Sequence, residues 1–157
     1  MYSDLITYDP ETGLFTWRTR SGHDAVRFNS RYAGKQAGTI NNKGYRMIKI
    51  NRKTVLAHRL AWFLTNGKWP TKHIDHINGV KTDNRIDNLR ECTHPENMQN
   101  RSGVKGYHFH NQTGKFQAHI TVNHKFISLG LFRTEEDASA AYAEAKKKYH
   151  TFNPDRR

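Results

Sequence analysis

The sequence predicts an α+β fold: N-terminal β-hairpins, then a strand–loop–strand–helix unit, then a small three-stranded antiparallel sheet packed on one helix. Short alternating runs are separated by turn signals along most of the 157 residues. Two helix-start signals stand at Thr93 and Thr134, and Ser102-Gly103 reads as a boundary. We therefore expect two domains, residues 1–102 and residues 103–157.

Residues 1–20 are predicted to form a two-stranded unit. Residues 8–13 (YDPETG) are typical of a turn, because proline fixes φ and glycine accepts a positive φ. Residues 14–18 then alternate as a strand does. Residues 19–38 are polar and contain several glycines and basic side chains, which favours a flexible or DNA-contacting loop.

The next residues predict a hairpin and a helix. Residues 45–50 and 54–56 make the hairpin, and residues 58–66 place apolar side chains on one helical face. Asn66-Gly67 ends this helix, and Pro70 keeps it from resuming.

The strand–loop–strand–helix unit follows. Residues 72–79 are predicted as a strand that turns at Asn78-Gly79, and residues 86–92 return after a polar loop. Thr93 and Glu96 have the spacing of a capping box, so we expect a helix to begin there.

Beyond Gly103 the pattern predicts the small sheet and its helix. Residues 106–110, 115–122 and 125–129 are strand-like and separated by good turn sequences. The helix that begins after Thr134 carries a stripe made mostly of alanine, which lets a helix lie close on a sheet.

Charge gives the first indication of function. The formal net charge is +12, and both predicted domains are basic: residues 1–102 carry 17 Lys and Arg against 9 Asp and Glu, and residues 103–157 carry 9 against 5. Polyanions are natural partners for such a chain, because each neutralised phosphate releases a counterion. We expect the positive charge to bind nucleic acid rather than only to aid solubility.

Other classes are excluded or disfavoured by composition. The single cysteine, Cys92, rules out an internal disulfide and the usual Cys-rich zinc sites, and a small buried side chain is its expected role. No stretch approaches the roughly 18 apolar residues that span a bilayer. We expect no membrane association and no small-molecule cofactor.

The Asp75-His76 pair is the candidate for chemistry. Phosphodiester hydrolysis needs an activated water, a cation near the developing negative charge and help for the leaving oxygen. Adjacent side chains on a strand normally point to opposite faces, yet both can reach one site where the strand bends. Asn97, on the following helix, could supply an amide oxygen. Taken alone, an Asp-His pair is more often structural than catalytic.

Five ordered blocks raise that expectation: residues 8–13 (YDPETG), 58–61 (HRLA), 74–79 (IDHING), 84–90 (NRIDNLR) and Asn97-x-x-Asn100. Together they resemble the HNH endonucleases of phages and mobile introns, including the homing type. The resemblance implies a ββα-metal finger in which His76 is the general base. It also implies that Asp75 and Asn97 bind one divalent cation, while Asn88 holds His76 in place. Amide and carboxylate oxygens favour Mg²⁺ or Mn²⁺.

Residues 103–150 resemble the Apetala-type DNA-binding domain of plant ethylene-response factors, on residues 103–107 (GVKGY), 114–120 (GKFQAHI), 129–132 (LGLF) and 135–142 (EEDASAAY). A strand ribbon of this kind fits the major groove. The resemblance implies DNA contacts from Lys105, His108, His110, Lys115, His119 and Thr121. A sheet that only grips phosphates is the alternative.

Other basic residues complete the expected interface with double-stranded DNA. Arg59 and Arg101 are candidate phosphate contacts. His58 is expected to make a structural hydrogen bond, and His73 to be exposed. One active site per chain predicts nicking by a monomer rather than a dimer. Residues 1–4 (MYSD) lack the basic-then-apolar profile of a signal peptide, so we expect a cytoplasmic protein, and the resemblance places it in a phage-infected bacterium.

Two other functions remain open at this point. One is a non-catalytic DNA-binding protein or regulator that retains an inactive HNH finger. The other is an RNA-binding factor, which no aromatic single-strand platform in the sequence favours.

Overall fold

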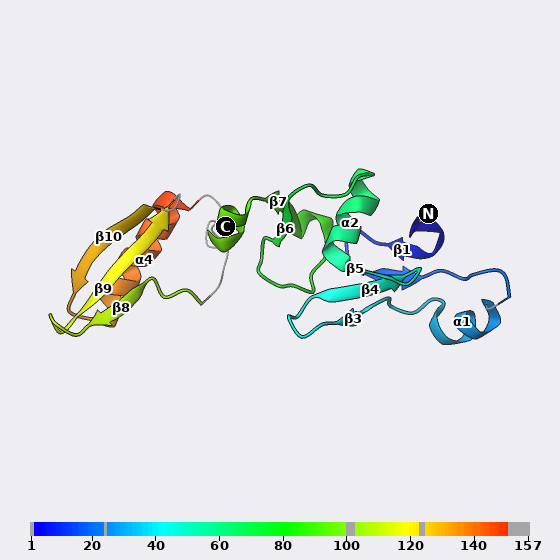
Figure 1. Ribbon diagram of the computed structural model, residues 1–157, viewed down its shortest axis with the longest axis horizontal. Coiled ribbons are helices and arrows are strands. Elements are labelled where there is room, and N and C mark those ends of the chain that lie inside the picture. Colours follow the sequence, from blue (N-terminus) through cyan, green and yellow to red (C-terminus); the bar gives the residue numbers. More distant parts are fainter. Residues whose placement is uncertain (1, 24, 100–102, 123–124, 151–157) are drawn as a thin grey trace. The chain divides into compact units, whose positions relative to one another are not determined.

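The structure is a computed structural model, and it describes residues 2–23, 25–99, 103–122 and 125–150 (Figure 1). The chain divides into two compact units, Met1–Cys92 and Thr93–Arg157. This division falls between Cys92 and Thr93, whereas the expected boundary lay between Ser102 and Gly103. The assignment of residues 1–102 and 103–157 to two functional domains stays a prediction.

The first unit opens with a short 3-10 helix and a two-stranded antiparallel sheet. These elements are η1 (Tyr2–Asp4), β1 (Ile6–Tyr8) and β2 (Phe15–Trp17). In the turn between the strands, the Asp9 carboxylate accepts the backbone N–H of Glu11 at 2.9 Å and the hydroxyl of Thr12 at 2.7 Å. The predicted two-stranded unit is therefore present, and an Asp-capped turn sets its register.

A helix interrupts residues 19–38, which the sequence predicted as a loop. This helix, α1 (Ala25–Tyr32), buries none of its residues. Aromatic contacts hold it instead: Phe28 meets Trp17 edge-on with 5.7 Å between ring centroids, and the Arg20 guanidinium lies 3.5 Å from the Phe28 centroid. These contacts join side chains eight to eleven residues apart, and the polar composition of the segment gave no sign of them.

A three-stranded antiparallel sheet and a helix follow. They are β3 (Thr39–Ile40), β4 (Arg46–Ile50), β5 (Lys53–Leu56) and α2 (Ala57–Asn66). The β4–β5 turn is Asn51-Arg52, both with positive φ (49° and 65°), as two-residue hairpins require. Gly67 ends α2 in the left-handed conformation at φ 72°. The predicted hairpin and helix are confirmed.

The last elements of the first unit form a two-stranded antiparallel sheet. They are β6 (His73–His76), η2 (Ile86–Asn88) and β7 (Leu89–Cys92). Asp75 lies opposite Arg90 across the pair, and His76 lies opposite Leu89. Directly opposed residues point to the same face of a sheet, so Asp75 and His76 lie on different faces.

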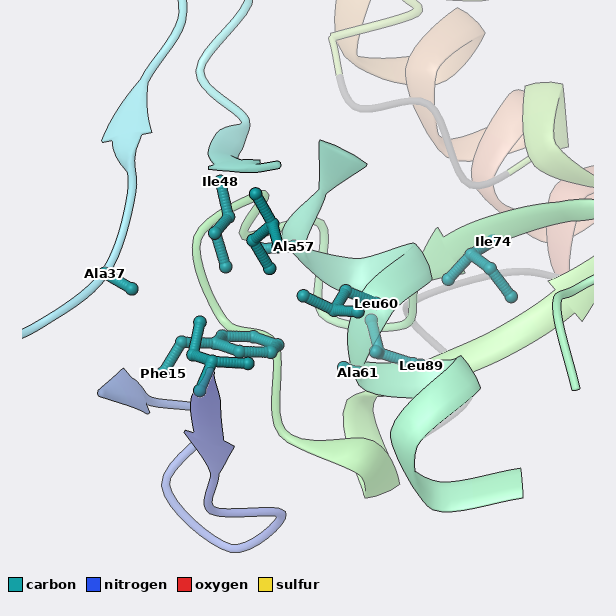
Figure 2. Close-up of a cluster of buried hydrophobic side chains, with 10 residues drawn as sticks. Phe15, Ala37, Ile48, Ala57, Leu60, Ala61, Ile74 and Leu89 are labelled. Carbon is teal, nitrogen blue, oxygen red and sulfur yellow. The ribbon is translucent and has the colours of Figure 1, made fainter. Parts of the chain in front are cut away.

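The core of the first unit joins β1, β2, β4, α2, β6 and β7. Phe15 from β2, Ile48 from β4 and Leu60 from α2 are fully buried. Ile74 and Leu89 extend the same cluster from β6 and β7 (Figure 2). Burying one such side chain fully stabilises a fold by about 1.5–3 kcal/mol. The β6–β7 pair is thus anchored on side chains contributed by residues 1–66.

The second unit contains a short helix, a three-stranded antiparallel sheet and a long helix. They are α3 (His94–Gln99), β8 (Tyr107–His110), β9 (Lys115–Val122), β10 (Lys125–Phe132) and α4 (Glu135–Tyr149), with β9 in the middle of the sheet. Ala138 and Ala145 of α4 are buried, as are Ala118 and Ile120 of β9, on which α4 packs. Alanine lets the helix lie close on the sheet, as predicted.

Both predicted capping signals are confirmed. The Thr93 backbone N–H donates to the Glu96 carboxylate at 2.7 Å, and Thr134 accepts the N–H of Asp137 at 3.1 Å. The mixed α+β class is confirmed as well, with several small antiparallel sheets. In the part of the chain that the structure describes, no helix is long and apolar enough to cross a membrane.

Candidate active site

Two neighbouring residues of β6, Asp75 and His76, are both buried, with 7% and 4% of their surfaces exposed. The Asp75 carboxylate accepts two hydrogen bonds from Arg90, from Nε at 3.0 Å and from a terminal nitrogen at 2.8 Å, both on Oδ2. A buried carboxylate requires such a partner, because removing a charge from water is costly. The Asp75–Arg90 ion pair therefore fixes the carboxylate on its face of the hairpin.

The loop after β6 is held by Asn88. Its side-chain oxygen accepts the N–H of Asn78 at 3.0 Å, and its amide donates to the carbonyl of Asp83 at 2.9 Å. Its own carbonyl accepts the N–H of Ile77 at 2.8 Å. Asn88 thus binds both ends of the loop that leaves His76, which gives a physical basis for the positioning role expected of it.

On the face of β6 opposite Asp75, the His76 imidazole packs beside two rings, those of His58 and Tyr45. The imidazoles of His58 and His76 meet edge-on, with 5.1 Å between centroids and planes 84° apart. The Tyr45 ring lies 5.4 Å from His58 and 6.0 Å from His76. His58, expected to make a structural hydrogen bond, is buried, and its Nδ1 has no hydrogen-bond partner among the described residues. Its visible role is to pack against His76.

Burial favours the neutral form of both histidines. Desolvation lowers the pKa of His76, opposed by Asn84 and by the charges of Asp75 and Asp83 and reinforced by Lys81. Desolvation and the neighbouring His76 lower the pKa of His58 to about 3. His76 is therefore ready to accept a proton at neutral pH, as a general base must be.

Asn84 supports His76 from the loop. It is buried, its amide donates to the Thr82 carbonyl at 3.0 Å, and its own carbonyl accepts the Tyr8 hydroxyl at 2.7 Å. Gly13 makes this approach possible: a Cβ at that residue would lie 2.5 Å from the backbone nitrogen of Arg85 and 2.6 Å from the carbonyl carbon of Asn84. The N-terminal turn is thus part of the framework of the site.

The remaining metal candidate, Asn97, lies on α3 in the second unit. Coordination of one ion by Asp75 and Asn97 stays a prediction. Among the described residues, no three His, Cys, Asp or Glu side chains form a metal cluster. An ion bound here would depend on few protein ligands.

The residues predicted to contact DNA lie in different structural environments. Arg59 donates to the carbonyls of Pro70 and Lys72, at 2.9 and 3.0 Å, so it also braces the segment after α2. Arg101 lies outside the described residues. His73 is exposed, as expected.

The second unit brings five of its six predicted contacts onto one surface. Ala118 and Ile120 face α4, so the alternation of β9, extended to β8 by the register, places these five on the opposite sheet face: His108, His110, Lys115, His119 and Thr121. Lys105 lies before β8 and pairs with Glu135 at 3.2 Å. Their contact with DNA stays a prediction.

A comparison with known proteins relates the segment that contains these residues to a protein family. Residues 55–99 match the family model of the HNH endonucleases. The HNH segment, as we call these residues, contains all four residues predicted for catalysis and metal binding: Asp75, His76, Asn88 and Asn97. Comparisons with curated proteins and with solved structures found no match. At the level of the family, the HNH segment supports a nuclease that acts on nucleic acid.

The sequence did not reveal several residues around His76. His58 and Asn84 lie in blocks that carried the resemblance, but nothing local indicated that they meet His76. Tyr45 lies outside the HNH segment, and Lys81 was read only as part of a polar loop. Their positions depend on how the three-stranded sheet packs on α2.

Proposed function

We propose that the chain is a metal-dependent DNA endonuclease that hydrolyses phosphodiester bonds and nicks double-stranded DNA. One observation carries the proposal: in a segment that matches HNH endonucleases, a neutral, buried His76 follows the buried Asp75 in β6, and Asn88 holds the loop between this strand and β7. The family match supports nuclease activity, and the geometry supports these roles.

His76 acts as the general base. It takes a proton from water as the water attacks phosphorus, and the P–O bond to the leaving oxygen breaks. The lowered pKa keeps the imidazole able to accept this proton at neutral pH. The His58 ring and the Asn84 amide restrict where the imidazole can turn. Asn88 acts indirectly, by fixing the loop.

The residues present fit a small hard cation. Asp75 offers one carboxylate and Asn97 one amide oxygen, and Mg²⁺ commonly binds through one or two carboxylates together with waters and substrate phosphates. One Mg²⁺ or Mn²⁺ ion, bound by Asp75 and Asn97, would stabilise negative charge at the phosphate. Arg90 keeps Asp75 oriented through one oxygen, Oδ2.

Charge and topology support the choice of DNA. The net charge of +12 favours a polyanion, and one face of β8 and β9 carries five of the residues that the resemblance to Apetala-type domains implies as DNA contacts. A single site per chain predicts nicking by a monomer. The homing type, and action in the cytoplasm of a phage-infected bacterium, stay expectations from the sequence.

The test is conversion of supercoiled plasmid to the open-circular form with Mg²⁺, with Mn²⁺ and with a chelator. We expect nicking with a divalent ion only, and none by His76→Ala, while that variant keeps DNA affinity within a few-fold. His73→Ala is the matched control, because His73 is an exposed histidine of the same strand on the other face. Undiminished nicking by His76→Ala would refute the assignment. DNA binding without cleavage under any divalent ion would favour a regulator with an inactive finger.

A further inference from the structure

A lysine of the loop after β6 is held at two points. The ammonium group of Lys81 donates to the carbonyl of Lys43 at 2.9 Å and lies 5.0 Å from the centroid of the Tyr45 ring. Lysine has a flexible four-carbon stem, and fixing it costs rotamer freedom. This exposed side chain is nevertheless placed over one particular ring.

The turn that receives Lys81 is itself well ordered. The Asn41 side chain accepts the N–H groups of Lys43 at 3.0 Å and Tyr45 at 2.9 Å, and its carbonyl accepts that of Gly44 at 2.9 Å. Gly44 has φ 84°, a conformation that glycine adopts without strain. A fixed turn therefore presents both the carbonyl and the ring to Lys81.

The Tyr45 ring connects this lysine to the site. The other neighbours of the ring are His58 and His76, at 5.4 and 6.0 Å between centroids. The positive charge of Lys81 is near enough to His76 to lower its pKa. Among the described residues, no carboxylate lies within ion-pair distance of the Lys81 ammonium. The Lys81 ammonium is therefore a cation with no carboxylate partner among the described residues, close to the His58–His76 pair.

We propose that Lys81 binds a backbone phosphate of DNA at the active site, held in place by Tyr45 and the Lys43 carbonyl; this rests on the proposed nuclease function. An ammonium carries three N–H donors, and Lys43 takes one. The two remaining donors and the full positive charge suit a phosphate oxygen. Tyr45 and Lys43 precede the HNH segment, so part of the substrate contact is built by the N-terminal sheet.

The experiment compares Lys81→Met with Lys68→Met. Lys68 is an exposed lysine just beyond the far end of α2, and α2 is about 15 Å long, so this control removes the same charge away from the histidine pair. DNA affinity is measured against salt concentration with a chelator present, and nicking of supercoiled plasmid is measured with Mg²⁺. Tryptophan fluorescence during urea unfolding checks that both variants fold.

We expect Lys81→Met to lower the slope of log affinity against log salt by about 0.9, the value for one phosphate contact, and to reduce kcat/KM for nicking at least tenfold. Lys81→Arg should restore the slope, and Lys68→Met should change neither quantity. If Lys81→Met nicks as the wild type does, or loses no more than Lys68→Met, the proposal is wrong. A wild type that cuts nothing would refute the nuclease function instead, and the salt slope alone would then decide for or against a Lys81–phosphate contact.

Discussion

The burial of the Asp75–Arg90 ion pair allows us to predict how much stability the loss of Arg90 would cost. The side chain of Asp75 is 8% exposed and that of Arg90 25% exposed, and two N–H groups of Arg90 meet one carboxylate oxygen. Arg90→Met keeps most of the apolar stem and removes both donors. The carboxylate then stays in the hairpin without the cation that compensates for its lost hydration.

The magnitude follows from burial. Removing one partner of a fully buried ion pair costs about 3–5 kcal/mol, and a hydrogen bond to a charged group is worth about 1.5–3 kcal/mol. Water reaches a quarter of Arg90, which screens the pair. We therefore expect Arg90→Met to lower the free energy of unfolding of the first unit by about 2–3 kcal/mol.

The assay is urea unfolding followed by tryptophan fluorescence. All three tryptophans, Trp17, Trp62 and Trp69, lie in the first unit, so the signal reports on that unit. With an m-value of about 2 kcal/mol/M, the midpoint should fall by about 1–1.5 M.

Arg85→Met is the matched control for this change. The Arg85 side chain is 52% exposed, and its pair with Asp83 should contribute less than about 1 kcal/mol. Equal losses in the two variants, or a loss below about 0.5 kcal/mol for Arg90→Met, would refute the reasoning. Mg²⁺ should recover more stability in Arg90→Met than in the wild type if Asp75 binds the cation, because the cation then replaces the missing charge.

Three further predictions concern the framework of the site. Because the pKa of folded His58 is about 3 and its ordinary value is 6.5, between these pH values the unfolded chain binds a proton that the folded chain does not. His58 alone should therefore cost the first unit about 2 kcal/mol between pH 7 and pH 5 in urea titrations. His58→Phe should remove that part of the loss and leave the part that comes from the lowered pKa of His76. Gly13→Ala should destabilise the same unit and reduce nicking, because its Cβ would meet backbone atoms of the Asn84 loop; unchanged melting would contradict this. Asn88→Ala should lower kcat with little change in DNA affinity, since it frees the loop without removing a basic residue; an effect on affinity alone would argue against a positioning role.

Much of the fold could be predicted because its signals are local. The capping box at Thr93, the N-cap at Thr134 and the glycine that ends α2 set element boundaries through neighbouring residues. Helix α1 could not be predicted in this way. It buries no residue, and it depends on contacts of Phe28 with Trp17 in β2 and with Arg20, which precedes the helix.

The same distinction holds for the site. Asp75, His76 and Asn88 lie in short, recognisable blocks, and the structure adds how each is held. The contacts of His76 with Tyr45 and His58 were not predictable, because they follow from the packing of β4 and α2 around the core. A lysine placed by a distant carbonyl, as Lys81 is, leaves no pattern in its own neighbourhood.

The core shared by β6, β7 and the N-terminal elements limits how this site can be transplanted. A two-stranded hairpin is marginally stable in water by itself, and Ile74 and Leu89 are buried against Phe15, Ile48 and Leu60 (Figure 2). An engineer who grafted only the HNH segment onto another scaffold would keep Leu60 but leave Phe15 and Ile48 behind, together with the Tyr45 ring. The smallest portable piece is therefore the whole first unit together with α3, which carries Asn97, and the N-terminal hairpins support the β6–β7 pair within it.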